Sequence, residues 1–454
     1  MKKRALWKHF QRMNPAAIVI YSYVIADLLG TLLLSLSISA KSDAVSLIDA
    51  LFTSTSALCV TGLTTVDTGG TFSVFGHTVI MVLMQLGGLG VMTFSVLLFL
   101  FLGHGFSSRG RWIITETFLP TPIKNTASLL SSIFLFTFVA EACGAVLLFL
   151  EWRSTMPIPS ALFAGVFHSV SAFCNAGLAL FPTSFVEYRG SILLNATICS
   201  LIVLGGIGFP VIYALISRLM QVRTRRRVPF SLHTRTVLAT TGILIAAGTA
   251  LVFGLERAHE LATLPLREQI LASIFQSITA RTAGFNTLDI GSLTVATLFI
   301  LVILMFVGAS PGSCGGGIKT TSLAVLAAIF NGRIRGQTSP TLFNRSIPNE
   351  VVSKTLSIFI LAVITVTIGL ILLIITQPEP PREDFLTYLF EAVSAFGTVG
   401  LSMGITPSLT VFGKLVIIVI MLLGRVGLLT IAYVVTSARS RAQYRYSEEK
   451  VMIG

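Results

Sequence analysis

The chain has 454 residues, of which 54% are hydrophobic and only 11% are charged. Soluble domains carry about 25% charged residues, so the composition excludes an ordinary soluble protein and indicates an integral membrane protein. The net charge of +13 does not indicate a nucleic-acid partner, because the basic residues sort to one side of the predicted membrane spans.

Taken in chain order, the sequence alternates long apolar runs with shorter ones. Runs of about 20 residues or more can cross the ~30 Å hydrocarbon core as helices. We place eight such spans at residues 16–39, 76–102, 127–150, 190–217, 236–256, 293–327, 351–376 and 411–437. Within each successive pair of spans lies a helix-like run that is too short to cross, which predicts a re-entrant segment.

A short motif recurs in these re-entrant runs. It starts at a phenylalanine, passes through a Ser-Ala or Thr-Ala pair and ends in a glycine followed by Leu or Phe, over residues 52–63, 167–178, 275–285 and 390–401. The glycines Gly62, Gly177, Gly284 and Gly400 are 115, 107 and 116 residues apart. Self-similarity at near-constant spacing predicts internal repeats, which we bound at 1–110, 111–230, 231–345 and 346–454. The predicted fold is an all-α integral membrane protein with four pseudo-symmetric helix–re-entrant pore loop–helix repeats around a central ion pore.

The ends of the motif have the composition of a selectivity filter, in which backbone carbonyls face the ion. Glycine reaches backbone angles that turn consecutive carbonyls to one side of the chain, and each preceding half-helix points its partially negative end at the cation. The alternative, a set of helix-packing motifs, explains the glycines but not the shared lead-in. The candidate residues for K⁺ binding through carbonyls are Cys59, Val60, Thr61, Gly62, Cys174, Asn175, Ala176, Gly177, Arg281, Thr282, Ala283, Gly284, Gly397, Thr398, Val399 and Gly400.

Two expectations follow for these filter loops. We expect their ends to pack against little, so that replacing Gly62 or Gly400 by Ser relaxes selectivity towards Na⁺ and leaves the fold intact. We expect Arg281 to pair with an acid outside the pore, the alternative being that its charge acts on the ion.

The first glycine of a second glycine motif lies 24 to 28 residues beyond each filter glycine. We interpret its copies at 86–90 and 204–210 as sites of close helix packing and bending. The third copy, at 307–317, holds too many glycines and a proline to sustain a helix, and unwound backbone at membrane depth must line the pore. It is therefore the candidate gate. The candidate gate residues are Gly308, Ser310, Pro311, Gly312, Ser313, Gly315, Gly316, Gly317, Lys319 and Arg425.

Arg425 lies in the fourth copy of this motif, deep in an apolar run. A charge inside the membrane is a functional hypothesis by default, and we expect Arg425 to hold the closed loop through its carbonyls and to repel cations. The alternative is a structural role beside a carbonyl or an acid such as Glu141. Residues 312–320 do not form a phosphate-binding loop, because Ile318 separates Lys319 from the last glycine.

The basic residues set the predicted orientation. The N-terminal stretch, the links 104–126, 218–235 and 319–354 and the C-terminal tail hold 23 of the 32 Lys and Arg residues. The positive-inside rule then places both termini in the cytoplasm and opens the filter loops outward. The densest cluster, 223–227, is a topology determinant, and contact with anionic lipid or an acidic partner is compatible with that role.

An enzyme would need titratable groups that converge, whereas the spans hold isolated charges such as Asp27 and Glu141. The five cysteines form no C-x-x-C pair, which predicts neither a disulfide framework nor a zinc site. The six histidines are scattered without metal-ligand spacing. We therefore predict a transporter without a bound cofactor, and not an enzyme.

With these motifs the chain resembles the Trk/Ktr/HKT superfamily of potassium transporters, and within it the membrane subunit of Ktr systems (KtrB-like). The resemblance covers nearly the whole chain. The segments that carry it are 60–69, 171–178, 281–286, 317–319, 394–401 and 424–430.

The resemblance implies K⁺ uptake through a central filter, often stimulated by Na⁺, by a homodimer in the cell membrane in contact with lipid. It also implies a cytosolic KtrA-like octameric ring of the RCK type, which binds nucleotide and regulates the gate. The chain departs from stricter potassium filters, because Leu63, Leu178, Phe285 and Leu401 follow the filter glycines. The alternative is therefore a Na⁺-permeable transporter or a symporter coupled to K⁺/Na⁺ or H⁺.

Overall fold

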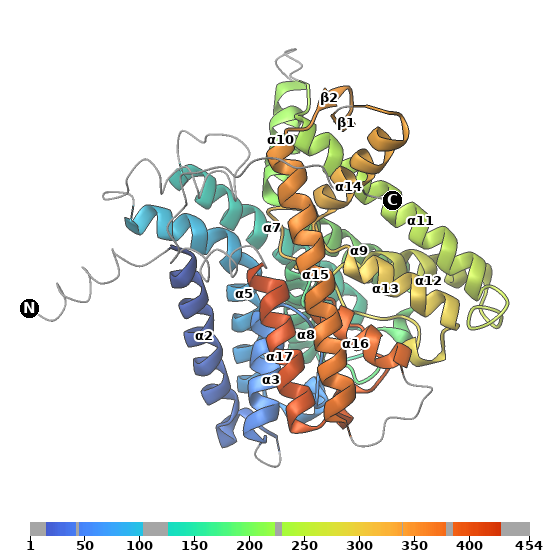
Figure 1. The fold of residues 1–454 in the computed structure, drawn as a ribbon. Coiled ribbons are helices and arrows are strands. Elements are labelled where there is room, and N and C mark those ends of the chain that lie inside the picture. Colours follow the sequence, from blue (N-terminus) through green and yellow to red (C-terminus); the bar gives the residue numbers. More distant parts are fainter. Residues whose placement is uncertain are drawn as a thin grey trace, which may run out of the picture.

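The computed structural model describes residues 15–41, 45–102, 126–222, 229–337, 339–377 and 385–427. These ranges form a helical bundle with one two-stranded antiparallel ribbon, β1 (Thr341–Leu342) and β2 (Arg345–Ser346), at one end of the molecule (Figure 1). The predicted cytoplasmic termini and the basic cluster 223–227 lie outside the described residues.

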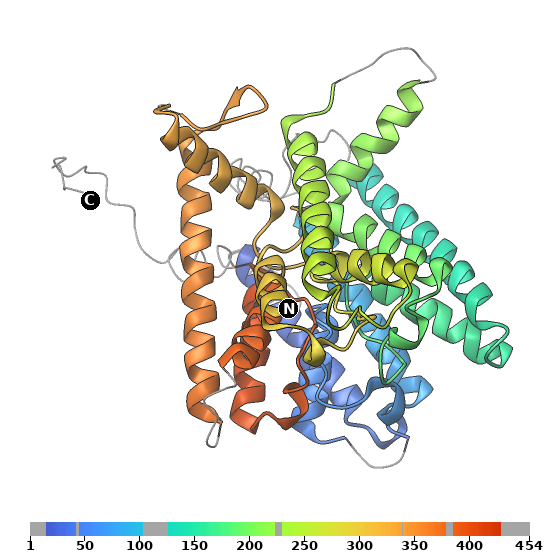
Figure 2. The ribbon, with the colours of Figure 1, turned by 90° about the vertical axis from the view of Figure 1, so that its right-hand side faces the viewer.

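Four short helices occupy the interior, and each packs against the long helix that precedes it in the chain. The short helices are α3 (Leu47–Leu58), α8 (Ile158–Cys174), α12 (Leu266–Thr279) and α16 (Phe385–Gly397). Their long partners are α2 (Pro15–Leu34), α7 (Thr126–Trp152), α11 (Leu232–Glu256) and α15 (Asn349–Thr376). Figure 2 shows α15 as a long helix at one edge of the molecule.

A further helix follows each short helix after a loop. These helices are α5 (Val74–Leu102), α9 (Ile192–Ile207), α13 (Val295–Phe306) and α17 (Val411–Val426). Two more helices, α10 (Phe209–Val222) and α14 (Thr320–Ile334), continue α9 and α13 beyond a break. The minor elements are α4 (Thr68–Thr71), η1 (Ser37–Ser39), η2 (Val186–Tyr188), η3 (Ile290–Ser292) and η5 (Thr406–Ser408).

Hydroxyl side chains fix where many of these helices begin. A Ser or Thr oxygen accepts a hydrogen bond from an otherwise unpaired backbone N–H of the first turn, which is the preferred N-cap arrangement. The residues that do so are Ser46, Ser191, Ser231, Thr294 and Thr410. A single Ser or Thr therefore sets the start of each of these five helices.

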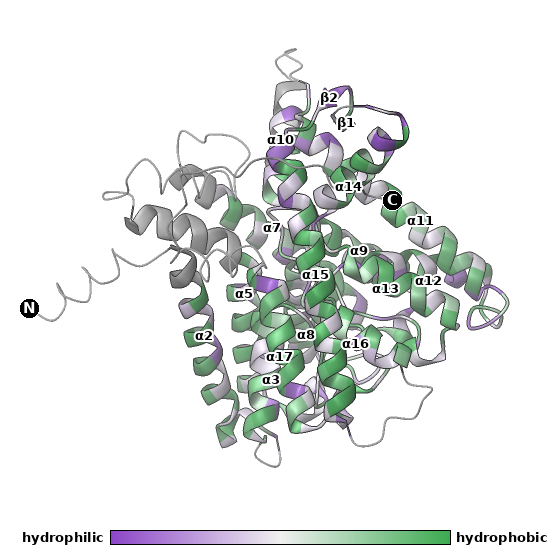
Figure 3. Ribbon diagram, viewed as in Figure 1, coloured by the Kyte–Doolittle hydropathy of each residue, from purple (hydrophilic) through white to green (hydrophobic). Residues whose placement is uncertain are grey.

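The outside of the bundle is apolar, as lipid requires. Leu32, Phe138 and Ile368 on α2, α7 and α15 are each more than half exposed, and Figure 3 shows hydrophobic residues along the outer helices. In the described part of the chain, three helices are long and apolar enough to cross a membrane, or four when the bent pair α9–α10 counts as one span.

Two of the predicted runs are interrupted, at the second and third copies of the second glycine motif, where we predict a bend and a break, respectively. The run 190–217 bends by 103° between α9 and α10, because Gly208 adopts φ 94° and Pro210 has no N–H for a helical hydrogen bond. The run 293–327 stops at Phe306 and resumes at Thr320, where the glycine-rich stretch lies. Of the last predicted span, 411–437, the structure describes a helix up to Val426.

Candidate functional site

The loops that follow the four short helices meet in a closed ring. We call residues 59–63, 174–178, 281–285 and 397–401 ring loops one to four. The glycine of each loop lies against the backbone of the next: a Cβ on Gly62 would meet the carbonyl of Ala176, and one on Gly177 the carbonyl of Ala283, each at 2.5 Å. A Cβ on Gly284 would meet the Val399 carbonyl still more closely, and one on Gly400 that of Thr61.

This arrangement contradicts the expectation that the loop ends pack against little. Each ring glycine has a neighbouring backbone where a side chain would start, so glycine is required there for close approach. The requirement is independent of the ion, and it means that a serine at Gly62 or Gly400 must displace the adjacent loop.

The backbone of the four ring loops has one shared conformation. Each loop has a left-handed residue two positions before its glycine, and a second one at the glycine itself, with φ between 67° and 94° at the glycines. Alternating left- and right-handed residues turn successive carbonyls towards the same side, which glycine allows without a steric penalty. The left-handed residues before the glycines are Val60 (φ 58°), Asn175 (61°), Thr282 (76°) and Thr398 (50°).

The Ser or Thr of the repeated lead-in fastens each ring loop. Its carbonyl accepts a hydrogen bond from the amide before the ring glycine in all four loops, for example Thr61 N to Ser56 O at 2.8 Å and Val399 N to Ser394 O at 2.9 Å. Its hydroxyl bonds the same loop again. The hydroxyl bonds are Gly62 N to Ser56 Oγ (3.0 Å), Gly400 N to Ser394 Oγ (3.1 Å), Ser171 Oγ to Leu178 O (2.8 Å) and Thr279 Oγ1 to Phe285 O (2.6 Å).

Sequence reasoning used these Ser and Thr residues as a repeat signal and missed their role. The third copy has one residue fewer between its lead-in hydroxyl residue and its ring glycine, and Thr279 still reaches ring loop three because the amide of Ala283 bonds four residues back, to Thr279 O, instead of five. The recurrence of a hydroxyl residue before alanine in each copy was the available signal.

The loop between α13 and α14, residues 307–319, lies against ring loops three and four. The amide of Gly316 donates to the hydroxyl of Thr398 at 3.0 Å, and the α-carbon of Gly315 faces the side chain of Thr282. Ser310 N and Cys314 N donate to carbonyls at the end of α9, at 3.0 and 3.1 Å. The 307–319 loop therefore joins the ring to the break between α9 and α10.

Two cations bond carbonyls of this loop, the half-buried Lys319 from within the loop and the buried Arg425 from α17. Lys319 donates from Nζ to the carbonyl of Gly315 at 2.6 Å. Arg425, which is 5% exposed, donates to the carbonyls of Cys314 and Gly87. Arg425 thereby connects α17, α5 and the 307–319 loop, and a carbonyl partner is what both the gate interpretation and the structural alternative predict.

Neither arginine singled out from the sequence has an acidic partner in the described part of the chain. The ion pairs found there are Arg189–Glu268 and Lys414–Asp49. Glu141 instead accepts from Gln85 at 3.3 Å, so Arg425 does not use it. The acid expected beside Arg281 is absent from the described residues, and Arg281 is buried next to its loop with 7% exposure.

Glycines of the following helices pack onto the ends of the short helices. A Cβ on Gly87, Gly205 or Gly424 would meet the carbonyl of Leu58, Phe173 or Phe396, respectively, and each carbonyl belongs to the residue just before a ring loop. The interpretation of the first two copies of the second glycine motif as close-packing sites agrees with this geometry.

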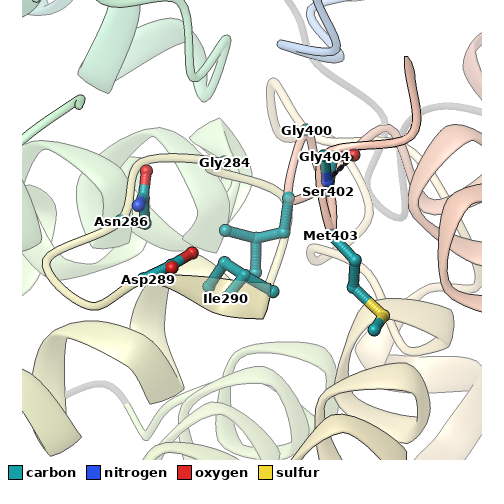
Figure 4. A pocket seen from close by; sticks show the side chains of 9 residues that line it. Gly284, Asn286, Asp289, Ile290, Gly400, Ser402, Met403 and Gly404 are labelled. Atoms are coloured by element: carbon teal, nitrogen blue, oxygen red, sulfur yellow. Dashed lines mark hydrogen bonds between the residues drawn. The ribbon is translucent and has the colours of Figure 1, made fainter. Parts of the chain in front are cut away.

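A small cavity opens beside the ring. It has a volume of about 170 Å³ and lies between ring loops three and four, with Asn286 and Asp289 on one wall and Ser402 and Met403 on the other (Figure 4). Behind it, the buried carboxylate of Glu391 accepts from Ser402 Oγ at 2.8 Å and Thr406 Oγ1 at 2.5 Å. These bonds fix the segment that leaves ring loop four.

Apolar helices closed around a ring of backbone carbonyls define the class of this protein as a multi-pass membrane transporter. Comparison with known proteins agrees. The sequence model of the TrkH family, described as a cation transport protein, matches residues 2–444, so the chain belongs to the TrkH family. It is a transporter and not an enzyme.

The chain is similar to several members over nearly its whole length. It is 39% identical to the Ktr system potassium uptake protein B of Bacillus subtilis (strain 168), with 98% of this chain and 97% of that protein covered. It is 37% identical to the Ktr system potassium uptake protein B of Vibrio alginolyticus (96% and 94% covered). Its identity to the potassium/sodium uptake protein NtpJ of Enterococcus hirae is 34% (100% and 99% covered).

The fold resembles the crystal structure of the potassium transporter TrkH from Vibrio parahaemolyticus. The TM-score is 0.73 with 18% sequence identity, and the match covers 94% of this chain and 86% of that one. At this identity the likeness concerns the arrangement of the helices.

Proposed function

We propose that this chain carries out channel-like uptake of K⁺ across the cell membrane, with the ring loops as a selectivity filter. The observation that carries the proposal is the closed ring, in which each left-handed glycine touches the next loop. Four loop segments with carbonyls turned to one side offer stacked rings of oxygens that can replace the hydration shell of a cation. The names of the similar proteins, which are potassium uptake proteins, support K⁺ as the ion.

The ring implies four pseudo-symmetric repeats, with boundaries at 1–110, 111–230, 231–345 and 346–454. Equivalent side-chain bonds support this division. In three repeats a serine of the short helix donates to a carbonyl of the preceding long helix. These bonds are Ser54 Oγ to Asp27 O (2.9 Å), Ser169 Oγ to Glu141 O (2.7 Å) and Ser277 Oγ to Ile245 O (2.9 Å).

The 307–319 loop is the proposed gate. In its closed position it lies against the ring, Arg425 of α17 fastens it, and Arg425 and Lys319 place positive charge beside the ion path. The charge-assisted bond from Arg425 to a loop carbonyl is strong, so opening needs an opposing input. We assign that input to a cytosolic nucleotide-binding ring, by similarity to a Ktr system. The same similarity supports a homodimer in the cell membrane, and the distribution of the basic residues supports cytoplasmic termini.

A second candidate is a Na⁺-permeable transporter or a symporter that couples K⁺ to Na⁺ or H⁺. Each ring glycine is followed by Leu or Phe, which gives a shorter filter than one with a second glycine in each loop. The printed name of the Enterococcus relative, potassium/sodium uptake protein, also favours it.

Flux into vesicles tests the proposal and separates the two candidates. Proteoliposomes that contain the purified chain and are loaded with K⁺ should take up a rubidium tracer from outside as K⁺ leaves. K⁺ added outside should inhibit this uptake far more than Na⁺ does. Equal block by Na⁺, or uptake that requires a Na⁺ or H⁺ gradient, supports the second candidate. Tracer uptake no greater than in empty vesicles, for the full chain and for a chain lacking residues 312–316, would overturn both.

A further inference from the structure

The 307–319 loop rests on side chains of the ring itself. Besides the bond from Gly316 N to Thr398 Oγ1 at 3.0 Å, a Cβ on Gly317 would lie 3.2 Å from the α-carbon of Gly397. Thr398 is fully buried, so its hydroxyl has no water to replace the Gly316 amide. The loop therefore does not merely lie beneath the ring, because one of its amides is a hydrogen-bond partner of a ring residue.

Thr398 is a strained residue. It adopts φ 50°, and a left-handed conformation is a genuine outlier for a β-branched residue. Such conformations persist only when the surroundings over-determine them. The Gly316 amide fixes the hydroxyl of Thr398 on one side, and the bond from Thr398 N to Ala395 O at 3.2 Å fixes its backbone. Withdrawal of the loop removes one of these restraints from ring loop four.

The equivalent position in the other loops extends this contact. Thr282 holds the same place in ring loop three, and its side chain faces Gly315 and bonds the side-chain amide of Asn175 in ring loop two at 3.1 Å. With the Asn175 amide turned to satisfy both of its atoms, its oxygen accepts from Thr282 and its nitrogen donates to Ile202 O and Ala172 O. In ring loop one the residue is Val60, which has no polar side chain.

We propose that Thr398 is a positioning residue that couples the gate to the filter. This inference rests on the proposed function of the ring and the loop. When the loop is closed, the Gly316 amide restrains the Thr398 hydroxyl; when the loop withdraws, ring loop four loses this restraint and its inner end relaxes. Val60 has the same left-handed conformation, φ 58°, without a polar side chain, so the bond restrains the side chain and is not required for the backbone conformation. Linkage is reciprocal, so an ion that holds the ring in order also favours the docked loop.

The test compares three variants in proteoliposomes without any cytosolic partner. Thr398→Val keeps the shape of the side chain and removes the acceptor, whereas Thr398→Ser keeps a hydroxyl. Thr365→Val is the matched control, because the Thr365 hydroxyl bonds Leu361 O within α15 at 2.8 Å, away from the ring. The two readouts are the initial rate of K⁺ flux and the ratio of K⁺ to Na⁺ flux.

We expect Thr398→Val to raise the K⁺ flux about five-fold, the factor that the net contribution of one hydrogen bond gives, and to lower the K⁺/Na⁺ ratio. Thr398→Ser, which keeps the hydroxyl, should stay close to the wild type in both flux and ratio, and Thr365→Val should change neither readout. A raised flux with an unchanged ratio overturns the coupling, because the bond would then only latch the loop.

If Thr398→Val leaves both the flux and the ratio unchanged while deletion of 312–316 raises the flux, the coupling by Thr398 is overturned and the proposed function is not affected. Absence of cation flux in the wild type and in the deletion overturns the proposed function instead. If Thr398→Val does not fold, hydrogen exchange on the wild-type protein decides. When K⁺ replaces choline in the buffer, the amide hydrogen exchange rate of residues 312–317 should fall at least about two-fold, with the rate of α15 as the reference. Equal rates of residues 312–317 in the two buffers overturn the coupling.

Discussion

Replacing Gly400 by Ala separates two reasons for a glycine in the ring. Gly400 has φ 94°, and an added Cβ would meet Thr61 O and lie 2.9 Å from the α-carbon of Gly62. The left-handed backbone costs a non-glycine residue about 1–2 kcal/mol. Displacing the neighbouring loop adds about 1–3 kcal/mol, the usual cost of overpacking. We expect Gly400→Ala to destabilise the protein by about 2–5 kcal/mol in total.

Two other glycines provide matched controls. Gly404 has φ 92° but nothing within 4 Å of an added Cβ, so Gly404→Ala bears the backbone cost alone, about 1–2 kcal/mol. Gly242 lies inside α11, also with open space around it, and Gly242→Ala should stabilise by roughly 0.5–1 kcal/mol because alanine favours the helix.

Thermal unfolding in detergent and the K⁺/Na⁺ flux ratio in vesicles are the measurements. From most to least stable, the order should be Gly242→Ala, wild type, Gly404→Ala and Gly400→Ala. Gly400→Ala should also lose discrimination against Na⁺. If Gly400→Ala matches Gly404→Ala in stability and keeps the wild-type ratio, the contact between ring loops one and four is not a constraint and the reasoning fails.

Three further predictions concern the gate, the ion pair between α17 and α3, and the driving force. Arg425→Ala should raise K⁺ flux without a partner more than ten-fold, because charge-assisted hydrogen bonds contribute about 1.5–3 kcal/mol each; a variant that only lowers protein level would make Arg425 structural. Lys414→Met should lower stability by about 2 kcal/mol, between the values for exposed and buried pairs, since its 2.7 Å pair with Asp49 is 12% and 17% exposed. Arg189→Gln, in a more exposed pair, should cost less than about 1 kcal/mol, and equal losses would contradict the burial argument. Accumulation should follow the membrane potential, with ~2.3 kcal/mol per 100 mV supporting roughly 50-fold accumulation, and accumulation that persists without a potential or ion gradient excludes a uniporter.

Local chemistry made much of the ring predictable from the sequence. A left-handed position that must also approach another backbone accepts only glycine, so the four glycines mark the loops wherever their partners lie. The glycines and the proline in 307–317 likewise predict that the helix breaks there. The break at Gly208 had a local signal too, in the Gly-Phe-Pro sequence, although the apolar run continues through it.

Contacts between distant segments were beyond the sequence. Arg425 reaches residues 111 and 338 positions away, and Asn175 meets Thr282 across 107 positions. A helix inside a membrane bundle is apolar on both its buried and its lipid face, so periodicity does not say which face turns inward. For the same reason the sequence suggested an acid for Arg281, while the structure buries that arginine without one in the described residues.

The ring is drawn from a single polypeptide, and this affects how such a protein can evolve. In a pore assembled from identical subunits, one codon change alters every corner of the ring at once. Here the carbonyls that face the four glycines belong to Thr61, Ala176, Ala283 and Val399, so each corner of the ring is encoded by its own codons and can mutate independently. Selection can adjust ion preference one quarter at a time, and a gene of this kind can pass through intermediate selectivities that a symmetric pore would have to skip.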